Sequence, residues 1–170
     1  MDNNTKYEHL KFLMERFDHY YDSINNKGAF YIGLNTFLLG GICVGYIAYH
    51  EKITNNYLFL GLIFAMMACC IVSILYTILA IRPYTKDNHV NDDCKSLIFF
   101  GGIADHTANF FFQKFDSETE DSILTDMKRQ VHCLAVGLNV KYKRLKYASM
   151  LLLAQFCTLL SLFFLTTKIL

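Results

Sequence analysis

The segment Tyr57–Ile81 has the sequence YLFLGLIFAMMACCIVSILYTILAI and contains no Asp, Glu, Lys, Arg or His. An α-helix rises about 1.5 Å per residue and the hydrocarbon core of a bilayer is roughly 30 Å thick, so about 20 such residues span it. Two further runs, Ala29–Tyr49 and Tyr147–Thr167, are equally free of charge. Three such runs in a chain of 170 residues argue against the buried core helices of a soluble protein, and they predict three transmembrane helices.

The first run lacks the features of a cleaved signal peptide. Five acidic residues precede it, and His50-Glu51-Lys52 follows it in place of a small-residue cleavage site. We therefore expect this span in the mature protein.

The basic residues are unevenly distributed among the segments between the runs. Four precede the first span and ten lie between the second and third, whereas the two short outer segments contain only Lys52 and Lys168. Lys and Arg mark the cytoplasmic side of a membrane protein. The sequence thus predicts a cytoplasmic segment 1–28, a span 29–49, an external hairpin 50–56, a span 57–81, a cytoplasmic segment 82–146, a span 147–167 and an external tail 168–170.

Both cytoplasmic segments contain an amphipathic helical pattern, in which apolar residues recur every three or four positions. The predicted fold class is therefore all-α: three transmembrane helices, of which the first and third extend into an amphipathic cytoplasmic helical stalk. The apolar positions of the first segment are Leu10, Leu13, Met14, Phe17, Tyr20, Tyr21 and Ile24, and those of the second are Ile123, Met127, Val131, Leu134, Leu138, Tyr142 and Leu145.

The ends of these stalk helices have their own signals. Ser117-Glu118-Thr119-Glu120 has the form of a capping box, which predicts that the second helix begins there. No proline interrupts residues 5–49, so the first helix is expected to continue into its span, with Asn25, Asn26 and Gly28 as points of bending. Aromatic patches around Phe99 and Phe111 are too short to span and are expected to pack across the stalk.

The polar residues inside the three runs are uncharged amides and hydroxyls. No ionisable group marks a proton relay or a voltage sensor, which disfavours a pump or a secondary transporter. Asn35 and Gln155 lie at similar depths from the cytoplasmic side, and Thr158 lies one turn beyond Gln155. Two interpretations remain open for Asn35 and Gln155: a hydrogen bond between helices, or the lining of a pore that opens on activation.

Small residues at a spacing of four predict close helix packing, either within one protomer or between protomers. The first span contains Gly41 and Gly45, and the second contains Gly61, Ala65, Cys69, Ser73 and Thr77.

Catalytic and metal-binding patterns are not recognisable in the sequence. There is no Gly-x-Ser-x-Gly, no phosphate-binding Gly-Lys-Ser/Thr loop and no helical His-Glu-x-x-His, so we expect no enzymatic activity and no cofactor. Four of the six cysteines lie within the runs, and no disulfide framework is implied. The polar cluster Asp87–Cys94 is interpreted as a solvated loop rather than a metal site.

Three segments, in their order relative to the spans, resemble the Pycsar effector domain family, the membrane proteins of bacterial cyclic-pyrimidine antiphage systems. They are Asn25-Asn26-Lys27-Gly28-Ala29-Phe30-Tyr31-Ile32-Gly33-Leu34-Asn35-Thr36-Phe37-Leu38-Leu39-Gly40, Ser96-Leu97-Ile98-Phe99-Phe100-Gly101-Gly102-Ile103-Ala104 and Leu134-Ala135-Val136-Gly137-Leu138-Asn139-Val140-Lys141-Tyr142-Lys143-Arg144-Leu145. The family usually has an acidic residue in place of Asn25 and an alanine in place of Gly28.

The resemblance implies an antiphage effector in the bacterial inner membrane. A partner cyclase would make a cyclic pyrimidine mononucleotide, cUMP or cCMP, and the effector would then impair the host membrane and cause abortive infection. We expect this nucleotide, the lipid bilayer and further copies of the chain as partners, and no nucleic-acid polymer. The alternatives are a constitutive three-span scaffold or assembly subunit, and a small enzyme with a membrane anchor.

A nucleotide site would need cations for the phosphate and an aromatic face for the base. Basic residues just cytoplasmic of a span are normally positive-inside anchors that contact headgroups, and a phosphate site is the alternative interpretation. The candidates for nucleotide binding are Lys27, Phe99, Phe100, Lys141, Tyr142, Lys143 and Arg144.

Overall fold

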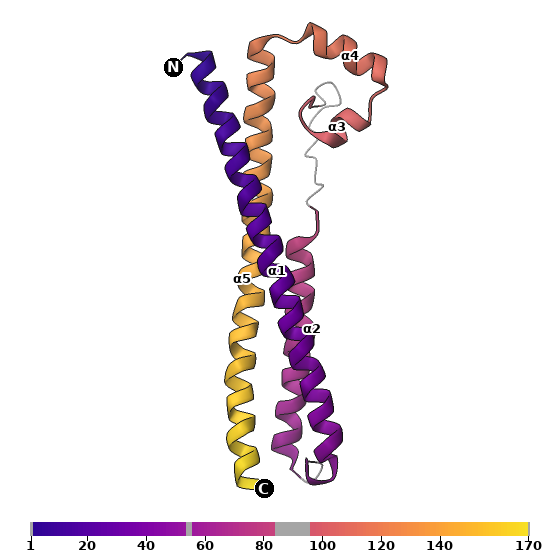
Figure 1. Ribbon diagram of the computed structural model, residues 1–170, viewed down its shortest axis with the longest axis vertical. Helices are drawn as coiled ribbons and strands as arrows, with labels where there is room; N and C mark the ends of the chain where they lie inside the picture. Colours follow the sequence, from indigo (N-terminus) through magenta and orange to yellow (C-terminus); the bar gives the residue numbers. More distant parts are fainter. Residues whose placement is uncertain (1, 54–55, 84–95, 170) are drawn as a thin grey trace. The chain divides into compact units, whose positions relative to one another are not determined.

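The computed structural model describes residues 2–53, 56–83 and 96–169, and every element in these residues is a helix (Figure 1). The predicted solvated loop at Asp87–Cys94 lies outside the described residues. The helices are α1 (Asn3–Ile53), α2 (Tyr57–Ile81), α3 (Phe100–Ala104), α4 (Ala108–Ser117) and α5 (Glu120–Ile169).

Three of these helices, α1, α2 and α5, contain a stretch long and apolar enough to cross a membrane. The chain divides into two compact units, and α1 and α5 contribute residues to both. The first unit comprises Met1–Tyr21 and Pro83–Asn139, and the second comprises Asp22–Arg82 and Val140–Leu170.

In the second unit, α1, α2 and α5 lie side by side (Figure 1). The buried residues of α2 alternate at spacings of four and three along its whole length, and those of α5 follow the same rule from Lys141 to Gln155. This spacing is typical of helices that pack along a coiled-coil seam. One apolar cluster of buried residues joins the three helices: Leu38, Phe59, Ile63, Met66, Cys70 and Leu162.

The ends of α2 are fixed by the residues that flank it. The side chain of Asn56, the N-cap residue, accepts a hydrogen bond of 3.2 Å from the backbone N–H of Phe59. This satisfies one of the donors that the first helical turn leaves without a partner. At the other end Arg82 leaves the helical conformation, with φ −51° and ψ 137°, as expected for the residue before Pro83.

Gly28 is the point where α1 approaches α2 most tightly among the glycines of α1 that the structure describes. A Cβ atom added there would collide with Cγ2 of Ile81 and would lie 3.5 Å from Cγ2 of Thr77. At Gly33, by contrast, an added Cβ would meet nothing within 4 Å. The missing side chain at position 28 therefore allows the contact between the two helices.

In the first unit, α1 packs against α5. Leu10 of α1 is buried with Leu124 and Met127 of α5, and Met14 and Val131 pack against this group. Further along, the hydroxyl of Tyr21 donates a hydrogen bond of 2.9 Å to the carbonyl oxygen of Leu134. Apart from Leu124, the residues in these contacts are apolar positions that the amphipathic patterns had predicted on the two helices.

The buried residues of α5 differ from the predicted apolar positions at two places. Ile123 and Tyr142 are each 37% exposed, whereas Leu124 and Lys141 are buried. Either choice satisfies a spacing of three and four, so the pattern alone did not separate them. The contacts of Lys141 at the end of α2, described below, explain its burial.

The predicted start of α5 is close to the observed one, but its cap residue was wrong. Ser117 is the last residue of α4, and its hydroxyl donates to the carbonyl oxygen of Lys114. Thr119 caps α5 instead, because its Oγ1 accepts a hydrogen bond of 3.3 Å from the backbone N–H of Ser122. Residues 25–28, which were expected as points of bending, keep helical backbone angles, and the non-helical conformation within α1 lies at Tyr49, with φ −119° and ψ 15°.

A turn in the first unit holds the Phe99 patch. Oδ2 of Asp126 accepts hydrogen bonds from the hydroxyl of Ser96 (2.9 Å) and the backbone N–H of Leu97 (3.0 Å). The Ser96 hydroxyl oxygen in turn accepts from the N–H of Phe99 at 3.1 Å. A Cβ added at Gly102 would collide with the carbonyl oxygen of Ser96, so this turn requires glycine there.

Candidate functional site

A circuit of hydrogen bonds between buried polar groups joins the three helices of the second unit. Nε2 of Gln155 on α5 donates to Oδ1 of Asn35 on α1 at 3.0 Å. Nδ2 of Asn35 donates to Oγ of Ser73 on α2 at 3.2 Å and to the carbonyl oxygen of Tyr31 at 2.7 Å. The Ser73 hydroxyl donates to the carbonyl oxygen of Ala148 at 3.3 Å, which returns the circuit to α5.

The circuit is shielded from the surroundings of the unit. Asn35 and Ser73 are completely buried, and Gln155 is 1% exposed. Thr77 lies one turn from Ser73, is also buried, and donates its hydroxyl to the Ser73 carbonyl oxygen at 2.8 Å. These groups carry no formal charge, so the three helices enclose a polar layer without an ionised group.

One atom of the layer has no hydrogen-bond partner among the described residues: Oε1 of Gln155. Both protons of the Asn35 amide nitrogen are used by Tyr31 and Ser73, and the Asn35 oxygen accepts from Gln155. The unsatisfied group is therefore an acceptor. A buried acceptor without a donor costs about 1–3 kcal/mol, so Oε1 of Gln155 is the one atom of the layer that weakens the contact between the helices.

The structure thus brings two of the predicted membrane-embedded polar residues, Asn35 and Gln155, into direct contact, and it separates the third from them. Thr158 is half-buried and donates its hydroxyl to the carbonyl oxygen of Ala154 within α5. Ser73 was predicted as a packing residue, and its part in the circuit was missed. Its hydroxyl was a signal of this role, because a serine in a span must find an acceptor.

The other residues predicted for helix packing are less enclosed. Cβ atoms added at Gly41, Gly45 and Gly61 would meet nothing within 4 Å, and Ala65 is exposed. Cys69 is half-buried. Within the described protomer, close approach of α1 and α2 therefore uses Gly28 rather than these three glycines.

Lys141 of α5 binds the C-terminal end of α2. Its ammonium group donates to the carbonyl oxygens of Ala80, Ile81 and Arg82 at 2.9, 3.1 and 2.8 Å, and the residue is 4% exposed. The last carbonyl groups of a helix have no partner within it and carry its negative dipole end, so a cation is well placed here. Lys141, predicted as a phosphate ligand, is therefore engaged inside the protein.

Arg144 strengthens the same contact. Its Nη1 donates to the carbonyl oxygen of Leu79 at 2.7 Å, so three successive carbonyl groups of α2 and that of its C-cap residue Arg82 have cationic donors from α5. Burial, and to a lesser extent the charge of Arg144, lowers the pKa of Lys141 from its ordinary value of 10.5. We call Lys141, Arg144 and the four carbonyl groups they bind the α2 clamp.

The remaining candidates for nucleotide binding are divided between the two units. Lys27, Tyr142 and Lys143 are exposed in the second unit. Phe99 and Phe100 belong to the first unit, where their ring centroids lie 4.7 Å apart and the Phe100 side chain is exposed.

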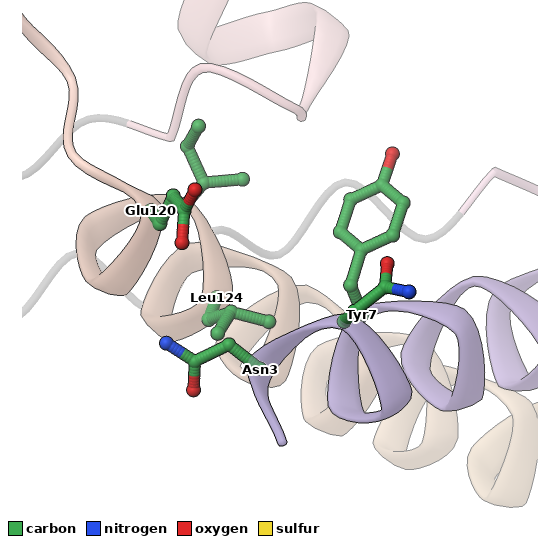
Figure 2. A pocket seen from close by; sticks show the side chains of 6 residues that line it. Asn3, Tyr7, Glu120 and Leu124 are labelled. Atoms are coloured by element: carbon green, nitrogen blue, oxygen red, sulfur yellow. The ribbon is translucent and has the colours of Figure 1, made fainter.

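A groove of about 250 Å³ lies in the first unit between the beginnings of α1 and α5. Figure 2 shows Asn3 and Tyr7 of α1 across from Glu120 and Leu124 of α5. The groove offers an aromatic ring and side-chain amides, but Glu120 lines it and Asp121 binds Asn3 beside it. These carboxylates make the groove unfavourable for an anionic phosphate.

Comparison with known proteins supplies a family. The family model described as Pycsar effector protein domain matches residues 9–168. No curated protein and no solved structure matches the chain.

Proposed function

The chain belongs to the Pycsar effector family, and on that premise we propose that it is an antiphage defence effector that responds to a cyclic pyrimidine mononucleotide, cUMP or cCMP, by impairing the host cell membrane. Abortive infection follows, because the infected cell stops growing before the phage completes its cycle. The family is not a known enzyme family, and we expect no catalysis.

The proposed location is the bacterial inner membrane, with α1, α2 and α5 each spanning the bilayer. Three helices of sufficient length and apolarity, together with the family match, indicate a membrane protein. The distribution of Lys and Arg supports a cytoplasmic N-terminus and a cytoplasmic segment 82–146. In this topology the three uncharged runs belong to the second unit.

The single observation that carries the proposed output is the buried polar circuit of Asn35, Ser73 and Gln155. It ties together three helices that hold no ionised group at that level, and in this proposal it is the contact that rearranges on activation. Because α1 and α5 contribute to both units, a change in the packing of the first unit has a covalent route to this circuit.

The nucleotide is proposed to bind at the cytoplasmic edge of the second unit, where Lys27, Tyr142 and Lys143 are exposed. Lys143 and Lys27 offer charge for the phosphate, and Tyr142 offers a ring for the base. Lys141 and Arg144 act in this account through the α2 clamp, which a phosphate nearby would weaken by competing for their charge.

The test is the membrane potential of bacteria that express the chain without a cyclase. A voltage-sensitive dye should report depolarisation after cUMP or cCMP is delivered, and no change after cyclic AMP. Unchanged potential with both pyrimidine nucleotides, in cells whose membranes contain the protein, would contradict the proposed function.

One observation favours a second candidate, a constitutive scaffold that assembles with other membrane proteins. Gly41, Gly45 and Gly61 offer open positions on α1 and α2, which suit close approach by another helix. The same positions suit a homo-oligomeric effector, which we propose as the active form. A scaffold would leave the membrane potential unchanged in the experiment above.

A further inference from the structure

We propose that the polar layer formed by Asn35, Ser73 and Gln155 lines the conducting path of the active form and binds a hydrated alkali cation there. This inference rests on the proposed function, because it names the route by which the membrane is impaired. It assigns a ligand class to a site that in the described state is closed.

The chemistry of the unsatisfied atom favours a cation or a water proton as its partner. Oε1 of Gln155 is an acceptor without a donor, in a side chain that is 1% exposed. In hydrocarbon the groups that satisfy it are a water proton or a cation. Both amide protons of Asn35 are already used by Tyr31 and Ser73, so the Asn35 amide does not satisfy this atom.

The polar layer lies near the cytoplasmic ends of the uncharged runs. Ser73 lies eight residues from Ile81, and Gln155 lies eight residues from Tyr147, which places both about 12 Å from the cytoplasmic ends of their uncharged runs. The apolar cluster begins directly beyond, because Leu38 follows Asn35 by one turn and Cys70 precedes Ser73 by one turn.

The chemistry of the Gln155 oxygen and the position of the polar layer together suggest how the path opens. On separation of the helices, water reaches the polar layer first, while the cluster of Leu38, Ile63 and Met66 is the apolar part that blocks conduction in the closed state. Hydrophobic constrictions gate by excluding water, and neutral carbonyl oxygens are typical ligands of permeating cations. The open path is therefore expected to prefer cations over anions.

The experiment measures currents in planar bilayers that contain the purified chain, under a KCl gradient, with cUMP or cCMP as the activator. Gln155→Glu places a charge in the layer and should shift the reversal potential toward that of potassium. Asn35→Leu with Gln155→Leu removes both partners, so no buried polar atom of this pair is left unsatisfied; this double variant should keep or raise its melting temperature and lose the current.

Thr158→Val is the matched control, since its hydroxyl bonds within α5 and is not part of the circuit. Its current and reversal potential should equal those of the wild type. A folded Asn35→Leu/Gln155→Leu variant that conducts normally, or a reversal potential that Gln155→Glu does not move, would overturn the inference. A wild-type chain that gives no current with either nucleotide would instead contradict the proposed function.

Discussion

The role of one basic residue, Lys141, depends on its contacts rather than on the sequence around it. Lys141 stands in a run of basic residues that is typical of both phosphate sites and membrane-edge anchors. The structure gives it a third role, because its ammonium group caps the end of α2. The neighbouring Lys143 is exposed and stays a candidate for the nucleotide.

Replacement of Lys141 by methionine tests this role. The apolar stem is retained, but the carbonyl groups of Ala80, Ile81 and Arg82 lose a charged donor, and each buried acceptor left unsatisfied costs about 1–3 kcal/mol. We expect a clear fall in the melting temperature of the protein in detergent. Lys143→Met is the control and should leave the melting temperature unchanged; equal effects of the two substitutions would refute the clamp.

The sequence patterns predicted which segments form long helices, and how long these are, better than they predicted which side of each helix is buried. α2 begins and ends with its uncharged run, because Asn56 caps one end and Pro83 follows the other. The inward face was harder to predict: Gly61 and Ala65 belong to a regular stripe of small residues, yet both positions are open or exposed. Periods of 3.5 and 4 residues diverge over a long helix, and packing partners decide between them.

The two glycines Gly28 and Gly33 on α1 offer a matched pair for testing the helix packing. Gly28→Ala forces a Cβ atom against Ile81, and overpacking of this kind costs about 1–3 kcal/mol. Gly33→Ala meets open space and should stabilise the helix by about 0.5–1 kcal/mol. Thermal unfolding in detergent should therefore shift in opposite directions, and a second substitution, Ile81→Ala, should restore much of the loss at position 28. Equal shifts would mean that α1 and α2 do not meet at Gly28.

For the molecule as a whole, the three long apolar helices followed from charge-free length, and the helical character of the described residues followed from that length together with the amphipathic patterns. Asn35 and Gln155 were recognisable as a pair because polar side chains are rare in such runs. The closed circuit of hydrogen bonds was not recognisable in the sequence. It depends on Ser73 and on the carbonyl group of Ala148, and a backbone carbonyl group has no signature in a sequence. The clamp on α2 escaped prediction for the same reason.

We propose that a cyclic pyrimidine nucleotide acting on this chain alone opens the membrane to ions. Potassium efflux from KCl-loaded liposomes that contain only the purified protein, followed with a potassium electrode, tests it most directly. We expect potassium efflux to begin as soon as cUMP or cCMP is mixed with the liposomes. We expect no efflux from liposomes that contain the Asn35→Leu/Gln155→Leu variant. Liposomes that retain their potassium with both nucleotides would contradict it.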